Sequence, residues 1–228
     1  MAPTSPSSRA PRRPFLPALW GLAALLAAAC GSYAPSQADL QAYLEARELY
    51  LKGDAEAAVP RLETLVARAG RFHQARFLLG KALFLSNRHP EAARSFASLL
   101  KHYPRYADAS LWRARALLAA GSLAEAEKTL TEAMAFSSED PRLLHAAGSL
   151  WESRGDYQKA LEYYQRAAVS GNELAETYLA IGKIYNRFRV YDKSLEYIDK
   201  SLGLLDEASL LHRPVVELKK RVQKEIKQ

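Results

Sequence analysis

The sequence is poor in the residues that most enzymes use for chemistry. It has one cysteine, Cys30, which excludes an intramolecular disulfide. Its five histidines are His73, His89, His102, His145 and His212. They are scattered, and no two of them stand at metal-ligand spacing on one helix. A glycine-rich phosphate loop and a Gly-x-Ser-x-Gly motif are also absent. The sequence therefore predicts a protein that is not an enzyme and that uses no cofactor and no metal.

Acidic residues are missing from the first 29 residues. This stretch carries Arg9, Arg12 and Arg13, followed by the apolar run LPALWGLAALLAAA. The run is shorter than the ~20 residues of a membrane-spanning helix. A basic start followed by a short apolar run is typical of an export signal. We therefore expect residues 1–29 to be a signal peptide.

The only cysteine comes directly after Ala27, Ala28 and Ala29. This arrangement resembles the lipobox of bacterial lipoproteins, in which a cysteine after a small-residue cleavage site receives the lipid. The resemblance implies lipidation of Cys30, with acylation of its new amino group giving three chains and stable anchoring. By the same analogy Gly31 favours the outer membrane of a Gram-negative cell. The alternatives are an uncleaved signal anchor, or an ordinary cleaved signal with an incidental cysteine.

Residues 30–38 form the predicted lipidated N-terminus and tether, in which the polar stretch GSYAPSQA is broken by Pro35. These eight residues reach about 28 Å when extended, at ~3.5 Å each, so the next domain would work close to the membrane. Loss of the three signal arginines lowers the net charge of the chain from +7 to +4. The stretch 213–228 also carries +4, which leaves the middle of the chain near neutral. The basic composition therefore does not indicate a nucleic-acid partner.

A 34-residue period runs through residues 39–208. Each unit of 34 residues is numbered from its own first residue, the first unit beginning at Asp39. Small residues stand at position 8 of every unit and again at position 20. Position 8 holds Ala46, Gly80, Ala114, Gly148 and Gly182, and position 20 holds Ala58, Ala92, Ala126, Ala160 and Ser194. Positions 4, 7, 8 and 11 share one face of a first helix, and positions 20, 24 and 27 share one face of a second. The small residues thus mark where two helices approach closely in each unit.

The period, the helix pair and the residue signature resemble the tetratricopeptide repeat, whose pattern is W-x2-L-G-x2-Y, then A-x3-F, then A and P. In the fourth unit the match runs through Leu144, Ala147, Gly148, Trp151, Ala160, Tyr164 and Ala167. In the second unit it runs through Leu79, Gly80, Leu83, Ala92, Phe96 and Pro104. The resemblance implies an all-α fold, a right-handed α-solenoid of five helix pairs. The pairs would occupy residues 39–72, 73–106, 107–140, 141–174 and 175–208, and a basic capping helix would occupy residues 209–228.

Two features depart from the family pattern. Pro60 lies inside the second helix of the first unit, and Arg189 stands where the fourth unit has the turn residue Gly155. We expect the fold to tolerate both. In the final segment Val215, Leu218, Val222 and Ile226 form an apolar stripe that would cover the exposed end of the fifth unit. A second interpretation is that the basic face of this segment touches anionic lipid head groups or another polyanion.

The resemblance also implies a concave surface lined by the first helix of each pair. Its predicted residues in the first three units are Tyr43, Arg47 and Tyr50, then Phe77, Lys81 and Phe84, then Leu111, Arg115 and Leu118. This set forms an aromatic and aliphatic floor with a ladder of single positive charges. An extended or helical peptide that carries acidic residues would complement it. The alternative is that these side chains pack between neighbouring helices.

Together these features predict a non-catalytic scaffold or adaptor that is lipid-anchored in the bacterial cell envelope and faces the periplasm. It would hold a protein partner in the concave groove, and its size and regular repeats favour a pilotin-like assembly role by family analogy. Two other roles stay open. One is a self-associating structural protein of the envelope, and the other is an accessory regulator of a periplasmic enzyme.

Overall fold

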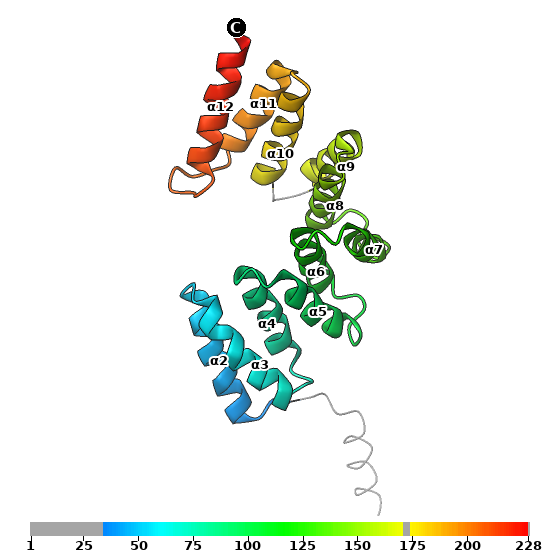
Figure 1. Ribbon diagram of the computed structural model, residues 1–228, viewed down its shortest axis with the longest axis vertical. Coiled ribbons are helices and arrows are strands. Elements are labelled where there is room, and N and C mark those ends of the chain that lie inside the picture. Colours follow the sequence, from blue (N-terminus) through cyan, green and yellow to red (C-terminus); the bar gives the residue numbers. More distant parts are fainter. Residues whose placement is uncertain (1–33, 171–173, 228) are drawn as a thin grey trace, which may run out of the picture. The chain divides into compact units, whose positions relative to one another are not determined.

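The computed structural model describes residues 34–170 and 174–227. The predicted signal peptide and the predicted lipidation site, Cys30, lie outside these residues. The described part of the chain contains eleven helices and no strand (Figure 1), which confirms the expected all-α fold. No helix in that part has both the length and the apolar character needed to cross a membrane.

Ten of the helices follow one another as five pairs, and an eleventh ends the chain. The pairs are α2 (Gln37–Leu51) with α3 (Ala55–Arg68), α4 (His73–Leu85) with α5 (His89–Leu100), α6 (Ala107–Ala119) with α7 (Leu123–Met134), α8 (Pro141–Ser153) with α9 (Tyr157–Ser170), and α10 (Leu174–Arg187) with α11 (Tyr191–Leu202). The last helix is α12 (His212–Ile226). We call the first helix of each pair an A helix and the second a B helix.

Close approach of the two helices explains the small residues of each pair. Every residue at position 20 is completely buried, from Ala58 in the first pair to Ser194 in the fifth. Gly148 faces the ring of Tyr164, and a Cβ at this glycine would lie 2.5 Å from the ring atom Cδ1. The same carbon at Gly80 would lie 2.6 Å from the ring of Phe96. A glycine is therefore required where position 24 of the same unit is aromatic.

The turn between the A and B helices has the same backbone form in all five pairs. The residue at position 15 of the repeat unit has a positive φ in all five units, at Gly53, Asn87, Gly121, Gly155 and Arg189. Glycine adopts this left-handed conformation without a Cβ penalty, and asparagine tolerates it better than most residues. Arg189, with φ of 59°, is therefore the strained member of the series.

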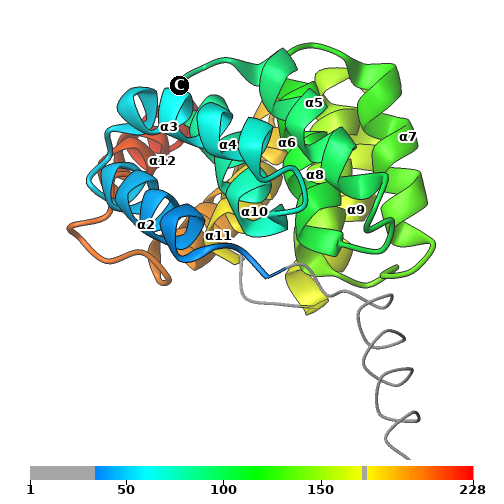
Figure 2. The ribbon, with the colours of Figure 1, turned by 90° about the horizontal axis from the view of Figure 1, so that it is seen from below.

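The pairs stack so that the A helices form the inner row. Helix α2 contacts α4, α4 contacts α6, and α6 contacts α8, and each B helix contacts the A helix of the next pair. Contacts of similar extent between successive B helices are not found within the described residues. Figure 2 shows α4, α6 and α8 next to one another, with α5 and α7 on their outer side. The exposed face of the A helices is thus the inner surface, as the family resemblance implied.

The departures in the sequence are accommodated locally. Pro60 lies within α3, and the helix continues past it to Arg68. The hydroxyl of Ser194 donates a hydrogen bond to the main-chain oxygen of Gly182 at 2.9 Å, so this buried polar group is satisfied. At the end of the chain α12 packs on α11 and buries Val215 and Val222. The apolar stripe of α12 is thus partly covered.

Candidate functional site

Several aromatic residues predicted for the inner surface pack against other rings of the protein. The Phe77 ring lies 5.6 Å from that of Phe96 and 5.3 Å from that of Tyr106, and Tyr43 lies 5.1 Å from Phe72, centroid to centroid. Tyr43 and Phe77 remain half-buried, so part of each ring stays accessible. Both residues stand at position 5 of their units, and their rings pack between neighbouring helices while keeping part of their surface toward the groove.

Leu111 is the predicted groove residue that the structure places inside. Its side chain is only 3% exposed and belongs to the main hydrophobic core. The interpretation that these positions pack between helices therefore applies to Leu111, which has no surface to offer a partner. Phe84 is intermediate, because it is half-buried and its ring lies 5.4 Å from that of Trp112.

Positive charges and aromatic rings from three successive A helices meet on the inner surface. Lys81 Nζ of α4 lies 5.2 Å from the ring centroid of Tyr50 on α2 and 5.2 Å from that of Trp112 on α6. The guanidinium of Arg115 lies 5.5 Å from the centroid of the same Trp112 ring. We call Tyr50, Lys81, Trp112 and Arg115 the cation–aromatic ladder. Each such contact contributes roughly 0.5–2 kcal/mol and holds the ammonium group in place.

Lys81 keeps a hydrogen-bonding capacity that the rings do not use. Its side chain is half-buried, and within residues 34–170 and 174–227 no carboxylate forms an ion pair with it. An ammonium group has three N–H donors, whereas a ring face offers only diffuse negative charge. A carboxylate brought by another molecule would therefore find donors already positioned.

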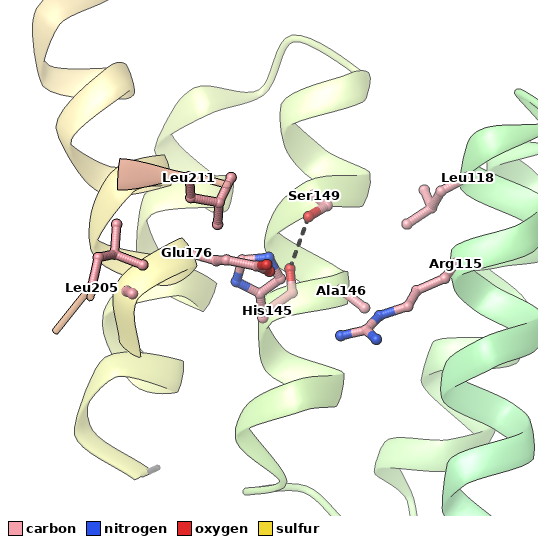
Figure 3. Close-up of a pocket in the computed structure, with 9 residues that line it drawn as sticks. Arg115, Leu118, His145, Ala146, Ser149, Glu176, Leu205 and Leu211 are labelled. Carbon is pink, nitrogen blue, oxygen red and sulfur yellow. Dashed lines mark hydrogen bonds between the residues drawn. The ribbon is translucent and has the colours of Figure 1, made fainter. Parts of the chain in front are cut away.

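Next to the ladder lies a pocket of about 430 Å³. Arg115 and Leu118 of α6 form one side of it, and His145, Ala146 and Ser149 of α8 lie opposite (Figure 3). Its remaining lining comes from Ala175 and Glu176 of α10 and from Leu205 and Leu211, which lie between α11 and α12. We call this hollow the His145 pocket. Apolar walls with an arginine and a glutamate on different sides suit a peptide side chain better than a single ion.

The polar groups of the His145 pocket are bound to one another. His145 Nδ1 lies 2.9 Å from Thr177 Oγ1, and the Ser149 hydroxyl donates to the main-chain oxygen of His145 at 3.2 Å. Behind them the Tyr164 hydroxyl donates to Glu152 at 2.7 Å. Burial raises the pKa of the Tyr164 hydroxyl further above its ordinary value.

These contacts do not form a nucleophile and base. The Ser149 hydroxyl lies 3.2 Å from the main-chain oxygen of His145 and 3.1 Å from the Tyr164 hydroxyl, so its hydrogen-bonding partners here are a carbonyl and a phenol. Metal-binding groups of three or more His, Cys, Asp or Glu side chains are absent from the part of the chain that the structure describes.

The structure brings together only part of the predicted set, and it adds residues further along the chain. Arg47 is exposed on α2, away from the pocket lining, whereas Arg115 and Leu118 do line it. His145 and Ser149 occupy positions 5 and 9 of the fourth unit, so the rule that predicted the groove also finds them. Leu205 and Leu211 lie outside the 34-residue period, and no repeat position pointed to them.

Comparison with known proteins agrees with this architecture. Family models described as "Tetratricopeptide repeat" match residues 43–99 and residues 83–150. No curated protein matches the chain in sequence. The fold defines the chain as a helical-repeat protein, a class whose surfaces serve as protein–protein interaction scaffolds. Within that class, residues 43–150 match the tetratricopeptide repeat family.

Solved structures show the same fold at low sequence identity. A thermophilic tetratricopeptide repeat protein of Thermus thermophilus is 17% identical, with a TM-score of 0.66, over 83% of this chain and 100% of that one. MamA of Desulfovibrio magneticus is 20% identical, with a TM-score of 0.63, over 75% and 97%. The pilF protein of Pseudomonas aeruginosa is 16% identical, with a TM-score of 0.67, over 84% and 85%. At these identities the likeness is one of fold.

Proposed function

We propose that the protein is a non-catalytic scaffold or adaptor of the bacterial cell envelope, and that it holds a peptide segment of a partner protein along its A helices. The observation that carries the proposal is Lys81. Its ammonium group lies between two rings from neighbouring repeats and forms no ion pair within the described residues. A charge held in this way favours a partner that brings a carboxylate.

The neighbouring surface indicates the rest of the ligand. An acidic residue on Lys81 would place neighbouring residues of the peptide near Arg115, which belongs to the ladder and also lines the His145 pocket. The apolar walls of that pocket suit an aliphatic or aromatic side chain. We therefore expect an acidic segment with at least one large apolar residue, bound in extended or helical form.

The envelope part of the proposal rests on the sequence. Lipidation of Cys30 would anchor the protein on the periplasmic side of the outer membrane, with the groove held near the membrane by residues 30–38. Metabolic labelling with an alkyne fatty acid tests this, because the parent protein should take up label and Cys30→Ala should not. A pilotin-like assembly role is the specific form that size and regular repeats favour. The similarity to MamA and to the pilF protein supports the fold of this chain and does not support the pilotin-like role.

Photo-crosslinking in cells tests the groove directly. A reactive residue at Leu118, half-buried in the lining of the His145 pocket, should give one discrete adduct whose partner mass spectrometry can identify. The control probe stands at Glu132, which is exposed on the outer helix α7. Adducts from Glu132 alone, or from neither position, would contradict the groove proposal. A product of twice the chain mass would favour the self-associating structural role.

A charge reversal separates the ladder from general electrostatics. Lys81→Glu should reduce formation of the Leu118 adduct about tenfold, which corresponds to ~1.4 kcal/mol of binding free energy. Lys128→Glu makes the same change of charge on α7, where Lys128 lies 4.0 Å from Glu132 on an exposed surface. The control should change the adduct by less than about twofold, because exposed pairs contribute little. Equal losses in both variants would show that only net charge matters.

A further inference from the structure

The strained turn between α10 and α11 has the same hydrogen bonds as its unstrained counterparts. The main-chain N–H of Arg189 donates to Asn186 at 3.0 Å, and that of Val190 donates to Tyr185 at 2.9 Å. In the fourth unit Gly155 and Asp156 make the equivalent bonds to Glu152 and Trp151, both at 2.9 Å. The backbone here is therefore ordinary for the repeat. What differs is that an arginine occupies a position that favours glycine, and strain of this kind often accompanies function.

The Arg189 side chain belongs to a second pocket, of about 280 Å³. This pocket lies where the turn between α10 and α11 meets the C-terminal half of α12. Its charged lining consists of Arg187, Arg189, Arg221 and Glu225. Asn186 and Tyr191 add neutral polar groups, and Leu218 and Val222 add an apolar wall. Three exposed arginines thus line one hollow, with Glu225 as the one carboxylate residue of the lining. We call it the three-arginine pocket.

At least half of the other arginines in the described residues form ion pairs, and these three do not. Arg88, Arg142, Arg154 and Arg166 each form an ion pair with a carboxylate at 2.8 Å or less. Within residues 34–170 and 174–227, no ion pair or side-chain hydrogen bond is made by Arg187, Arg189 or Arg221. The Glu217 carboxylate, whose pKa is lowered first by Lys220 and in part by Arg221, offsets some of this charge, but three like charges in one place still repel one another. An arrangement of that kind gains stability from an anion.

Arg187 is also held in a defined orientation. Its guanidinium carbon lies over the ring of Tyr157, 4.4 Å from the centroid, so the ring covers one side of the group. The N–H groups of a guanidinium point outward in its plane, and a ring on the face leaves them free. The Phe188 ring makes an edge contact with the same tyrosine at 6.0 Å, centroid to centroid, which restricts that ring further. Arg187 is thus positioned to donate to oxygen atoms.

We propose that the three-arginine pocket binds a phosphate group. A phosphate group offers several oxygens and up to two negative charges, which matches three donor forks better than a single carboxylate does. The group can belong to a small phosphorylated molecule or to the head group of an anionic phospholipid. None of the pocket's residues lines the ladder or the His145 pocket, so this site does not depend on the proposed peptide groove.

Titration of the full-length chain with pyrophosphate tests the proposal, with thermal shift and isothermal calorimetry at constant ionic strength as readouts. Cosedimentation with phosphatidylglycerol vesicles, compared with phosphatidylcholine vesicles, distinguishes the two sources of the phosphate. Pyrophosphate binding alone would assign a small phosphorylated ligand. Selective, Arg189-dependent binding to phosphatidylglycerol would assign a head group. Absence of both would overturn the proposal.

Arg189→Gly is the decisive variant, because glycine suits the left-handed backbone and removes only the side chain. It should fold at least as well as the parent protein and bind about tenfold more weakly. Asn87→Gly makes the equivalent change in the second unit and should leave binding unchanged. Glu225→Gln removes the one carboxylate and should tighten binding severalfold. Parent-like affinity of Arg189→Gly would refute the site even if some anion binding is observed.

Discussion

Gly148→Ala should destabilise the protein although it replaces a glycine inside a helix. Alanine is favoured over glycine in a helix interior by about 1 kcal/mol, so propensity alone predicts a gain. The new Cβ would lie 2.5 Å, 2.6 Å and 2.9 Å from three ring atoms of Tyr164. Real Cβ atoms essentially never come that close to another heavy atom, so either the ring or the backbone must move.

Tyr164 has little freedom to move away. Its side chain is 1% exposed, its ring lies 5.1 Å from that of His145, and its hydroxyl is bonded to Glu152. Overpacking of a close-packed core costs typically 1–3 kcal/mol, and we expect the upper end here. After the ~1 kcal/mol gain in propensity, the free energy of unfolding should fall by about 2 kcal/mol. For a domain of this size that corresponds to roughly 4–8 °C in Tm.

The other repeats indicate which second substitution should restore the stability lost in Gly148→Ala. In the third unit the equivalent pair is Ala114 with Leu130, both buried, so alanine is accepted where position 24 is leucine. A double-mutant cycle with Gly148→Ala and Tyr164→Leu, measured by urea unfolding, should give a favourable coupling of at least about 1 kcal/mol. Gly70→Ala is the control, since its Cβ would lie 3.8 Å from the nearest atom. A stabilising Gly148→Ala, or additive double mutants, would refute this explanation of the small residues.

Three further outcomes are expected from the same unfolding assay. Burial raises the pKa of the Asp140 carboxyl, but hydrogen bonds from Arg142 outweigh it and hold the pKa below its ordinary value of 3.8. The stability that this shift contributes is complete above about pH 3.8 and is lost as the pH falls through the lower folded pKa. Asp140→Asn should therefore weaken the pH dependence of the free energy of unfolding below about pH 4. An unchanged slope would contradict this. Pro60→Ala restores a helical N–H donor within α3 and should stabilise by roughly 1–3 kcal/mol, whereas a loss would show that the helix needs the proline. Arg189→Gly should stabilise by about 1 kcal/mol through relief of left-handed strain, and a destabilised variant would show that its side chain supports the fold.

The architecture could be predicted from the sequence because small residues recur where two helices touch. Ala92 and Ala160, both completely buried, show why the period was visible. The pairing of position 8 with position 24 was also present in the sequence. Alanine accompanies leucine in the first and third units, and glycine accompanies an aromatic residue in the second and fourth. That pattern has a steric cause that only the distances to the rings make plain.

The groove was predictable in position but not in detail. Leu111 and Leu118 both occupy predicted groove positions, yet one is buried and the other lines a pocket. That outcome depends on how each side chain meets the neighbouring helix, and a repeat position does not encode it. Lys81 was predicted as a single positive charge, whereas its place between two rings depends on side-chain conformations in three helices. Leu211 escaped prediction because it lies outside the period.

The nearest-neighbour stacking of the pairs has a consequence for how the chain can change in length. Each A helix contacts the adjacent pairs, and the matched residues at positions 8 and 24 lie within a single unit. A segment of 34 residues can therefore be duplicated or removed together with its own steric match, while the remaining surfaces still meet surfaces of the same kind. A shift of one residue more or fewer would place every later small residue on the wrong face of its helix. Duplication of a whole 34-residue unit would therefore lengthen the groove without requiring a new core.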